Sequence, residues 1–452
     1  MKTTSPQVAG TEPGQRQLNG PQTTGREYQN LSRPQYVHRR DDDIEVPMRD
    51  GVSLLADVHR PDAEGKFPAL IAASPYPRQI QDLGAPMGFV EAGASDFFVP
   101  RGYVHVIANL RGTGGSGGTF GLFDSQERRD LYDLVEWAAA QPWCDGSVGM
   151  IGISYFAMTQ LEAAVERPPH LKAIFPVAVS SDLYEAARPN GLFSSTFMTP
   201  FVAMLGITSE HDSKLWRGKV LNAARKVLNA GKVHEKFAHR NGESAVGVMK
   251  LATKLGYDPQ PWDDLWQDAA VEHQLRDDWW DERNLLPLLD RIEIPVYLGC
   301  DWQNVPLHLP STFTTLAALA GNENVRVAML GEFGLTWPWE SLHVEALAWF
   351  DQWLKDRDTG IMDGPPIRYW LPGADTWRTA DSWPPANSFH REFSLCADGR
   401  LSEDEGIVGA RTYTTLGSGL GRDGTKPTDP PRQLVWTSDR MTSSVEVVGD
   451  IE

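Results

Sequence analysis

The sequence of 452 residues is poor in cysteine, in long apolar runs and in positive charge, and each shortage excludes a class of protein. Its three cysteines are far apart and odd in number, so they fit neither a disulfide framework nor a zinc site. They are Cys144, Cys300 and Cys396. No apolar run is long enough to cross a bilayer, and the opening MKTTSPQVAGTEPGQ lacks the apolar stretch of a secretory signal. These absences favour a cytoplasmic protein without a membrane partner.

The shortage of positive charge bears on partners. The chain has 42 Lys and Arg residues against 60 Asp and Glu residues, which gives a formal net charge of -18. Nucleic acids and anionic membranes attract a basic surface, so neither is expected as the main partner. Apolar residues make up 41% and charged residues 23%, which is the balance of a soluble globular protein. At about 150 residues per domain, the length suggests two or three domains.

An alternating rhythm of short apolar runs and helical patterns dominates the middle of the chain. Residues 1–40 precede it and predict a disordered tail, because they carry few large apolar side chains. Continuous apolar runs suit strands buried on both faces, and their alternation with helices indicates a doubly wound parallel α/β domain. We place this domain in residues 41–180 and 291–357. Its apolar runs are FPALIAAS (67–74), YVHVIANL (103–110), VGMIGIS (148–154), LKAIFPVAV (171–179), IPVYLGC (294–300) and VRVAMLG (325–331).

Two segments depart from this rhythm. Residues 181–290 have helical patterns and no strand runs, which predicts a helical cap inserted between two strands of the sheet. Residues 358–452 have short strands punctuated by Pro and Gly, which predicts a C-terminal β domain that is incomplete. An unfinished sheet exposes unpaired edges, so we expect it to pair with another copy of the chain. The tryptophans of the cap either line an apolar acyl or aryl site or pack the cap itself: Trp262, Trp266, Trp279 and Trp280.

The strongest local motif is GMIGISYFA at 149–157. A buried strand runs directly into a helix with Ser154 at the junction, which is the setting of a nucleophile elbow. Gly152 suits the sharp turn, and the backbone N–H of Tyr155 lies at a helix N-terminus, where it can stabilise an oxyanion. Phe156 occupies the second glycine position of the general G-x-S-x-G pattern. An ordinary strand-to-helix turn with a serine cap is therefore the alternative.

Two further motifs follow predicted strands. In SPYPR (74–78), Tyr76 either points its hydroxyl at the site or packs in a Pro-rich turn. NLRGTGGSGG (109–118) contains G-x-G-x-x-G, but a dinucleotide loop is disfavoured. TFGLFDSQ intervenes before the helix, and the acidic Asp130 lies inside the helical pattern. The three aspartates at 41–43 are interpreted as a solvated charge run.

Taken together, these motifs resemble the cocaine-esterase-like hydrolases, the family grouped with the X-Pro dipeptidyl-peptidases. The resemblance implies an α/β-hydrolase core, a helical cap and a C-terminal jelly-roll-like domain. It also implies Ser154 as nucleophile, with an oxyanion hole made by Tyr76 and the backbone N–H of Tyr155. The matching segments are MRDGVSLLADVHRP (48–61), SPYPR (74–78), NLRGTGGSGG (109–118), QPWCDGSVGMIGISYFAMTQ (141–160), DRIEIPVY (290–297), LAWFDQWLK (347–355) and WRTADSWPP (377–385).

The other two triad positions depart from the family pattern. The family's acid ends a G-W-Y-D motif, and alignment on Trp302 puts Asn304 at the acid position. The family's base ends a G-P-W-x-H motif after the next strand, and GEFGL (331–335) puts Leu335 at the histidine position. Leucine cannot take a proton from serine, and asparagine does not stabilise an imidazolium as a carboxylate does.

Three interpretations therefore remain open. In the first, a relocated base restores hydrolysis. His343, which opens the helix after the usual histidine loop, is the first candidate, with Asp301 as acid; His308, on the segment after Asn304, is the second candidate. Each histidine is otherwise a packed or loop residue. In the second interpretation, Ser154 and its oxyanion donors serve a non-hydrolytic reaction such as a cyclisation or elimination. In the third, the protein is a binding pseudoenzyme.

We predict the first of these. The expected reaction is hydrolysis of a small-molecule ester or amide through an acyl-Ser154 intermediate, without cofactor or metal. Dipeptidyl-peptidase activity is less favoured than esterase activity, because no acidic anchor for a substrate N-terminus can be assigned from the sequence.

Overall fold

The structure is a computed structural model, and it describes residues 26–81, 90–208, 261–302, 307–331, 342–404, 406–412 and 434–448. The chain divides into two compact units, residues 1–379 and residues 380–452. The first unit holds the central sheet and every residue of the predicted site that the structure describes.

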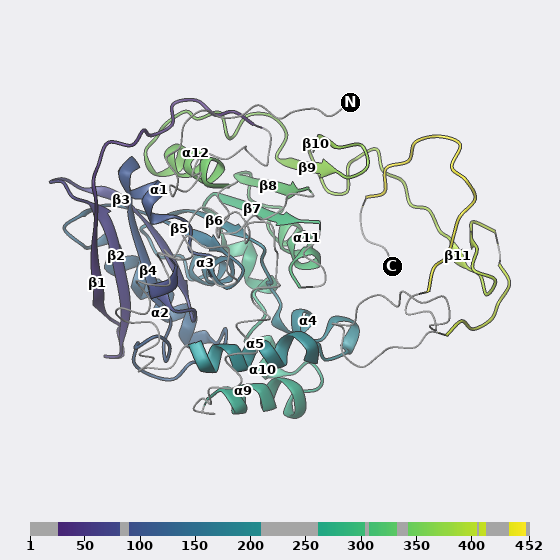
Figure 1. Cartoon of the computed structure of the whole chain (residues 1–452), viewed down its shortest axis with the longest axis horizontal. Coiled ribbons are helices and arrows are strands. Elements are labelled where there is room, and N and C mark those ends of the chain that lie inside the picture. Colours follow the sequence, from purple (N-terminus) through teal and green to yellow (C-terminus); the bar gives the residue numbers. More distant parts are fainter. Residues whose placement is uncertain are drawn as a thin grey trace, which may run out of the picture. The chain divides into compact units, whose positions relative to one another are not determined.

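A ten-stranded sheet forms the centre of the first unit (Figure 1). Its spatial order is β1-β2-β4-β3-β5-β6-β7-β8-β9-β10. β1 and β2 pair antiparallel, as do β2 and β4, whereas the pairs from β4 through β3 and β5 to β9 are parallel. The strands are β1 (His38–Pro47), β2 (Ser53–Pro61), β3 (Phe67–Ser74), β4 (Val104–Asn109), β5 (Cys144–Ile153), β6 (Leu171–Val177), β7 (Val296–Asp301), β8 (Val325–Leu330), β9 (Ile367–Leu371) and β10 (Thr376–Ala380).

Helices of varied length accompany this sheet. The α-helices are α1 (Ser95–Phe98), α2 (Ser125–Ala139), α3 (Tyr155–Val165), α4 (Leu183–Ala187), α5 (Ser195–Thr208), α9 (Trp262–Gln267), α10 (Asp278–Asp281), α11 (Leu309–Ala318) and α12 (His343–Leu354). Shorter 3-10 turns are η1 (Arg78–Ile80), η2 (Val99–Arg101), η3 (Pro189–Gly191) and η6 (Leu286–Arg291), and η5 (Asp268–Glu272) is a π-helical turn.

The glycines of β5 show how helices cover both faces of the sheet. A Cβ added at Gly149 would lie 2.7 Å from the ring of Phe350 in α12, whereas one at Gly152 would lie 2.3 Å from Cβ of Phe156 in α3. Because successive side chains of a strand point to opposite faces, residues three apart face opposite sides. α12 and α3 therefore cover opposite faces, as Figure 1 shows, and both pack closely against the central strand. The predicted doubly wound α/β core is confirmed.

Residues 26–40 fall within the predicted disordered tail, but the structure gives several of them specific tertiary contacts. The N–H and hydroxyl of Ser32 donate to the buried carboxylate of Asp351 in α12, at 2.5 and 2.6 Å. Arg26 donates to the carbonyls of Gly360 and Ile361. These contacts order the stretch from residue 26 onward, since a buried carboxylate needs donors that the tail supplies. Composition alone does not reveal such tertiary partners.

The predicted boundary of the C-terminal β domain at residue 358 also differs from the structure. β9 pairs with β8 in the central sheet, and β10 follows β9 in the strand order, so both extend the sheet of the first unit. The described part of the second unit contains a two-stranded antiparallel sheet, β11 (Ser394–Leu395) with β12 (Leu401–Ser402). The jelly-roll-like domain stays a prediction.

The glycine-rich loop at 109–118 connects β4 to the segment before α2. Two of its N–H donors bond to carbonyls within the loop: Gly112 donates to Gly117 at 2.9 Å, and Ser116 donates to Thr113 at 2.8 Å. α2 begins at Ser125, and Asp130 lies within it. The interpretation that this loop is not a dinucleotide cradle agrees with this arrangement. No helix in the described part of the chain is long and apolar enough to cross a membrane.

Candidate active site

Ser154 lies in a strained turn between β5 and α3. Its φ and ψ are 59° and -119°, a conformation that non-glycine residues rarely adopt and that is found at functional turns. The backbone N–H of Ser154 donates to the carbonyl of Val177 at 3.0 Å, which ties the turn to the neighbouring strand β6. Gly152 has a φ of 142°, and a Cβ there would also lie 3.3 Å from the Glu91 carbonyl oxygen. This is the geometry expected of a nucleophile elbow.

Tyr76 lies beside the elbow at the carboxyl end of β3. Its side chain is 4% exposed, and its ring packs edge-on against those of Tyr155 and Phe156, with centroids 6.1 and 5.9 Å apart. Burial and the charge of Glu91 raise the pKa of the Tyr76 phenol well above 10, although a hydrogen bond with the Ser154 side chain acts in the opposite direction. The hydroxyl therefore stays protonated and can donate a hydrogen bond next to Ser154.

His308 provides the imidazole that contacts the serine. Its Nε2 lies 3.2 Å from Oγ of Ser154, and its side chain is buried. It immediately precedes α11 and reaches the site from the segment that follows β7. The carboxyl ends of β5 and β7 meet at the same edge of the parallel sheet, which brings two residues 154 positions apart into hydrogen-bond contact.

The second nitrogen of His308 fixes the tautomer. Nδ1 lies 3.2 Å from the carbonyl oxygen of Val179 and 3.1 Å from Oγ of Ser180. A carbonyl can only accept, so Nδ1 carries the proton and Nε2 is left as the acceptor for the Ser154 hydroxyl. Burial lowers the pKa of His308 to about 4, while the bond to Val179 opposes the shift. The imidazole is therefore neutral at neutral pH.

The first base candidate, His343, occupies a different environment. It opens α12, is fully buried, and stacks on Phe97 with ring centroids 5.2 Å apart and on Phe98 edge-on at 5.7 Å. Its neighbours are thus the aromatic side chains of α1. Asp301 ends β7, is 8% exposed, and lies opposite Leu330 in β8.

Two positions of the altered triad lie outside the described residues. They are Asn304 and Leu335. His308 is only the second candidate from the sequence, because the family pattern places the base after β8. A signal that favours it is available in the sequence, since LHLPSTF places the histidine just before a Pro-containing helix start that follows the strand ending at Asp301.

Two tryptophans of the predicted cap are buried and pack against other parts of the protein. Trp262 is 4% exposed and its ring lies 5.2 Å from that of Phe120, which in turn contacts Tyr155. Trp280 is fully buried and donates from Nε1 to the His273 carbonyl at 2.7 Å. The structure thus favours the packing alternative for these two side chains.

A pair of buried carboxyl groups that no sequence motif marks lies beneath the elbow. The hydroxyl of Tyr155 donates to both carboxylate oxygens of Glu127 in α2, at 3.1 and 3.2 Å. Burial, followed by the charge of Asp124, raises the pKa of Glu127 to about 8. Burial and the charge of Glu127 raise the pKa of Glu162 of α3 well above its ordinary value. At neutral pH the pair therefore retains protons.

Comparison with known proteins identifies the family of the chain. Residues 50–332 match the model of the family described as X-Pro dipeptidyl-peptidase (S15 family). The chain belongs to this family. Cocaine esterase from a Rhodococcus species is 29% identical over 423 residues, which cover 87% of this chain and 69% of that protein. A putative Xaa-Pro dipeptidyl-peptidase of Bacillus cereus is 25% identical over 383 residues, which cover 77% of this chain and 58% of that protein.

Two solved structures share the fold of this chain. A CocE/NonD family hydrolase from Staphylococcus aureus aligns with a TM-score of 0.59 at 25% identity, over 81% of this chain and 60% of that one. An α-amino acid ester hydrolase aligns with a TM-score of 0.57 at 19% identity, over 88% of this chain and 67% of that one. The predicted α/β-hydrolase fold is confirmed. The S15 chain described here spans 58% to 69% of the lengths of these four proteins.

Proposed function

We propose that this protein is a serine hydrolase that cleaves a small-molecule ester or amide, with Ser154 as nucleophile and His308 as general base. The observation that carries the proposal is the 3.2 Å contact between Nε2 of His308 and Oγ of Ser154, with Nδ1 held toward a carbonyl. A serine hydroxyl needs such an acceptor to become nucleophilic. His308 thus replaces His343 as the proposed base.

The proposed reaction has two halves. Nε2 of His308 takes the Ser154 proton as Oγ attacks the substrate carbonyl carbon. The Tyr76 hydroxyl and the Tyr155 backbone N–H donate to the oxygen that becomes negative. His308 then returns the proton to the departing alcohol or amine, which leaves acyl-Ser154. Water, deprotonated by His308, releases the carboxylic acid and restores the serine.

The groups that orient His308 distinguish this site from the usual triad. In the described part of the chain, Nδ1 of His308 contacts a carbonyl oxygen and the Ser180 hydroxyl, which are neutral acceptors. Neutral acceptors fix the tautomer but stabilise the imidazolium less than a carboxylate does. We propose that this arrangement supports slower turnover than a carboxylate triad. Asp301 stays a predicted acid.

Labelling with a fluorophosphonate tests the proposal. Oγ of Ser154 forms a bond to phosphorus, fluoride leaves, and the serine proton passes to His308. We expect the wild-type protein to gain the mass of the phosphonyl group on the peptide that contains Ser154, and Ser154→Ala to gain none. A folded wild-type protein that stays unlabelled would overturn the proposal and favour the non-hydrolytic or binding alternatives.

The pH dependence of labelling is a second test. Because the pKa of His308 is lowered to about 4, the base stays neutral in mildly acidic solution. We expect the labelling rate at pH 5.5 to remain close to that at pH 7.5 and to fall as the pH drops through about 4. A histidine with an ordinary pKa of about 6.5 would lose about tenfold at pH 5.5. A midpoint near 6.5, with circular dichroism unchanged, would contradict the assignment.

A further inference from the structure

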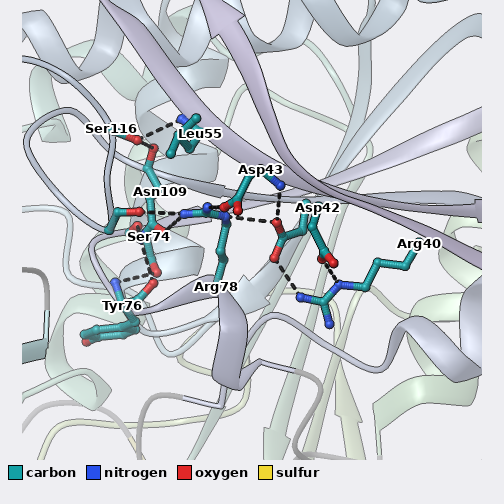
Figure 2. Close-up of polar contacts among 11 residues, drawn as sticks. Arg40, Asp42, Asp43, Leu55, Ser74, Tyr76, Arg78, Asn109 and Ser116 are labelled. Atoms are coloured by element: carbon teal, nitrogen blue, oxygen red, sulfur yellow. Dashed lines mark hydrogen bonds and ion pairs between the residues drawn. The ribbon is translucent and has the colours of Figure 1, made fainter. Parts of the chain in front are cut away.

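Arg78 is a fully buried cation at the start of η1, two residues after Tyr76. Figure 2 shows its guanidinium at the centre of a polar network between the carboxyl end of β3 and the glycine-rich loop. Nη1 of Arg78 donates to Oδ1 of Asn109 at 3.0 Å and to the carbonyl of Gly114 at 2.6 Å. Nε donates to the buried carboxylate of Asp57 at 3.0 Å, and Nη2 pairs with Asp43. The buried charge is thus compensated.

Asp43 belongs to the acidic run that was interpreted as solvated. Its side chain is half exposed, yet it pairs with the buried Arg78, and its backbone N–H donates to Asp57 at 3.0 Å. Asp43 is therefore part of the network, so the interpretation as a purely solvated charge run is wrong for this residue.

Asn109 connects Arg78 to the backbone of Tyr76, the proposed oxyanion-hole residue. While Oδ1 of Asn109 accepts from Arg78, Nδ2 donates to the carbonyl of Tyr76 at 2.8 Å and to that of Ser74 at 3.4 Å. The N–H of Tyr76 donates to Oγ of Ser74 at 3.0 Å. Both backbone polar groups of Tyr76 are therefore bound, which restricts the direction in which its side chain leaves the turn (Figure 2).

The glycine-rich loop makes the close approach to Asn109 possible. Gly114 has a φ of +56°, and a Cβ there would lie 2.1 Å from Oδ1 of Asn109. Ser116 holds the same loop to β2, since its hydroxyl accepts from the N–H of Leu55 at 2.9 Å and donates to the Asn109 carbonyl at 3.0 Å. The glycine-rich motif thus lets the loop approach the buried polar groups of Asn109 and Arg78 closely.

We propose that Asn109 and Arg78 are positioning residues that aim the Tyr76 hydroxyl at the oxyanion formed on Ser154. The inference rests on the proposed hydrolase function. It assigns them no contact with substrate, so their replacement should lower kcat through Tyr76 and leave KM nearly unchanged.

A double-mutant cycle tests this. Asn109→Asp keeps the acceptor for Arg78 but puts an oxygen where Nδ2 donated to the Tyr76 carbonyl. With a short-chain p-nitrophenyl ester, we expect Tyr76→Phe to lower kcat about 10²-fold and Asn109→Asp to lower it about tenfold. In the Tyr76→Phe background, Asn109→Asp should change kcat less than about twofold, because the hydroxyl that it aims is gone.

Two further variants keep the cycle decisive. Arg78→Lys is run in the same cycle, since lysine cannot reach all four acceptors of the guanidinium. Thr113→Val is the matched control: it removes a buried hydrogen bond of 2.8 Å to the Leu110 carbonyl in the same loop, and we expect lower stability with unchanged kcat.

The outcomes separate the two proposals. Additive losses in the cycle, a rise in KM without a fall in kcat, or failure of both Asn109→Asp and Arg78→Lys to fold would overturn the positioning role alone, with the wild-type enzyme active. A wild-type protein inert toward both ester and fluorophosphonate would overturn the hydrolase function and the positioning role with it.

Discussion

Replacing His308 with glutamine is expected to slow fluorophosphonate labelling of Ser154 by about 10²–10⁴-fold, the range that a general base contributes. Glutamine retains a polar side chain of similar length, but it cannot take the Ser154 proton. The rate constant for labelling, measured at pH 7.5 across several probe concentrations, reports the loss directly because only the phosphonylation of Ser154 is followed.

The same substitution at His343 is the matched control. His343→Gln disturbs a fully buried ring stacked on Phe97, so we expect a lower melting temperature. The labelling rate of the folded protein should stay within about twofold of wild type, since a buried stacking residue mainly affects stability. The reverse order, with labelling lost in His343→Gln and retained in His308→Gln, would refute His308 as the base and restore His343 as the candidate.

Glu162→Gln is expected to change the free energy of unfolding more favourably at pH 8 than at pH 5, and the difference should be about 1–3 kcal/mol. In the folded protein, burial and the Glu127 carboxyl raise the pKa of Glu162, and Glu127 itself titrates near 8. In the unfolded chain both groups ionise near 4.5. The folded state therefore binds more protons between these values, and the free energy of unfolding falls as the pH rises from about 4.5 to about 8.

Chemical unfolding in urea at pH 5 and pH 8 measures this difference. Glu166→Gln, one turn further along, is the control because Glu166 is partly exposed and lies 3.5 Å from Arg128. We expect the control to leave the pH dependence of unfolding nearly as it is in wild type. Equal effects of Glu162→Gln at both pH values would show that the carboxyl pair is not protonated in the folded protein.

Two kinds of titratable group lie next to the turn at Ser154: the imidazole of His308 and the carboxyl pair of Glu127 and Glu162. His308 needs to be neutral, which its pKa of about 4 permits over most of the pH scale. The carboxyl pair under Tyr155 lowers the free energy of unfolding progressively as the pH rises from about 4.5 to about 8. A mildly acidic pH therefore keeps His308 neutral while most of the stability of the elbow is retained.

Much of the fold was predictable because buried parallel strands have a strong signature. The continuous apolar runs identified β3 to β8, and the junction at Ser154 identified the elbow. β9 and β10 were assigned to another domain because their sequences are short, mixed and punctuated by Pro and Gly. Their place at the edge of the sheet depends on pairing with β8, a tertiary contact that local pattern does not encode.

The site was predictable where its chemistry is local and not where it depends on distant contacts. Ser154, Tyr76 and Tyr155 were named from motifs, and the structure brings their side chains and the elbow together. His308 precedes α11 and His343 begins α12, and the sequence does not show which of these two helix starts lies near the carboxyl end of β5. Glu127 and Glu162 were missed because each sits in an ordinary helical pattern, and their contact exists only once α2 packs on α3.

The strand order has a consequence for how the protein is made. β6 and β7 are neighbours in the sheet, but the chain between Val177 and Val296 must be synthesised before they can pair. Loop closure over such a length slows folding more than it weakens the final state. The half that carries Ser154 and Tyr76 emerges from the ribosome well before the half that carries His308. A nascent chain therefore holds the proposed nucleophile before its proposed base has been synthesised.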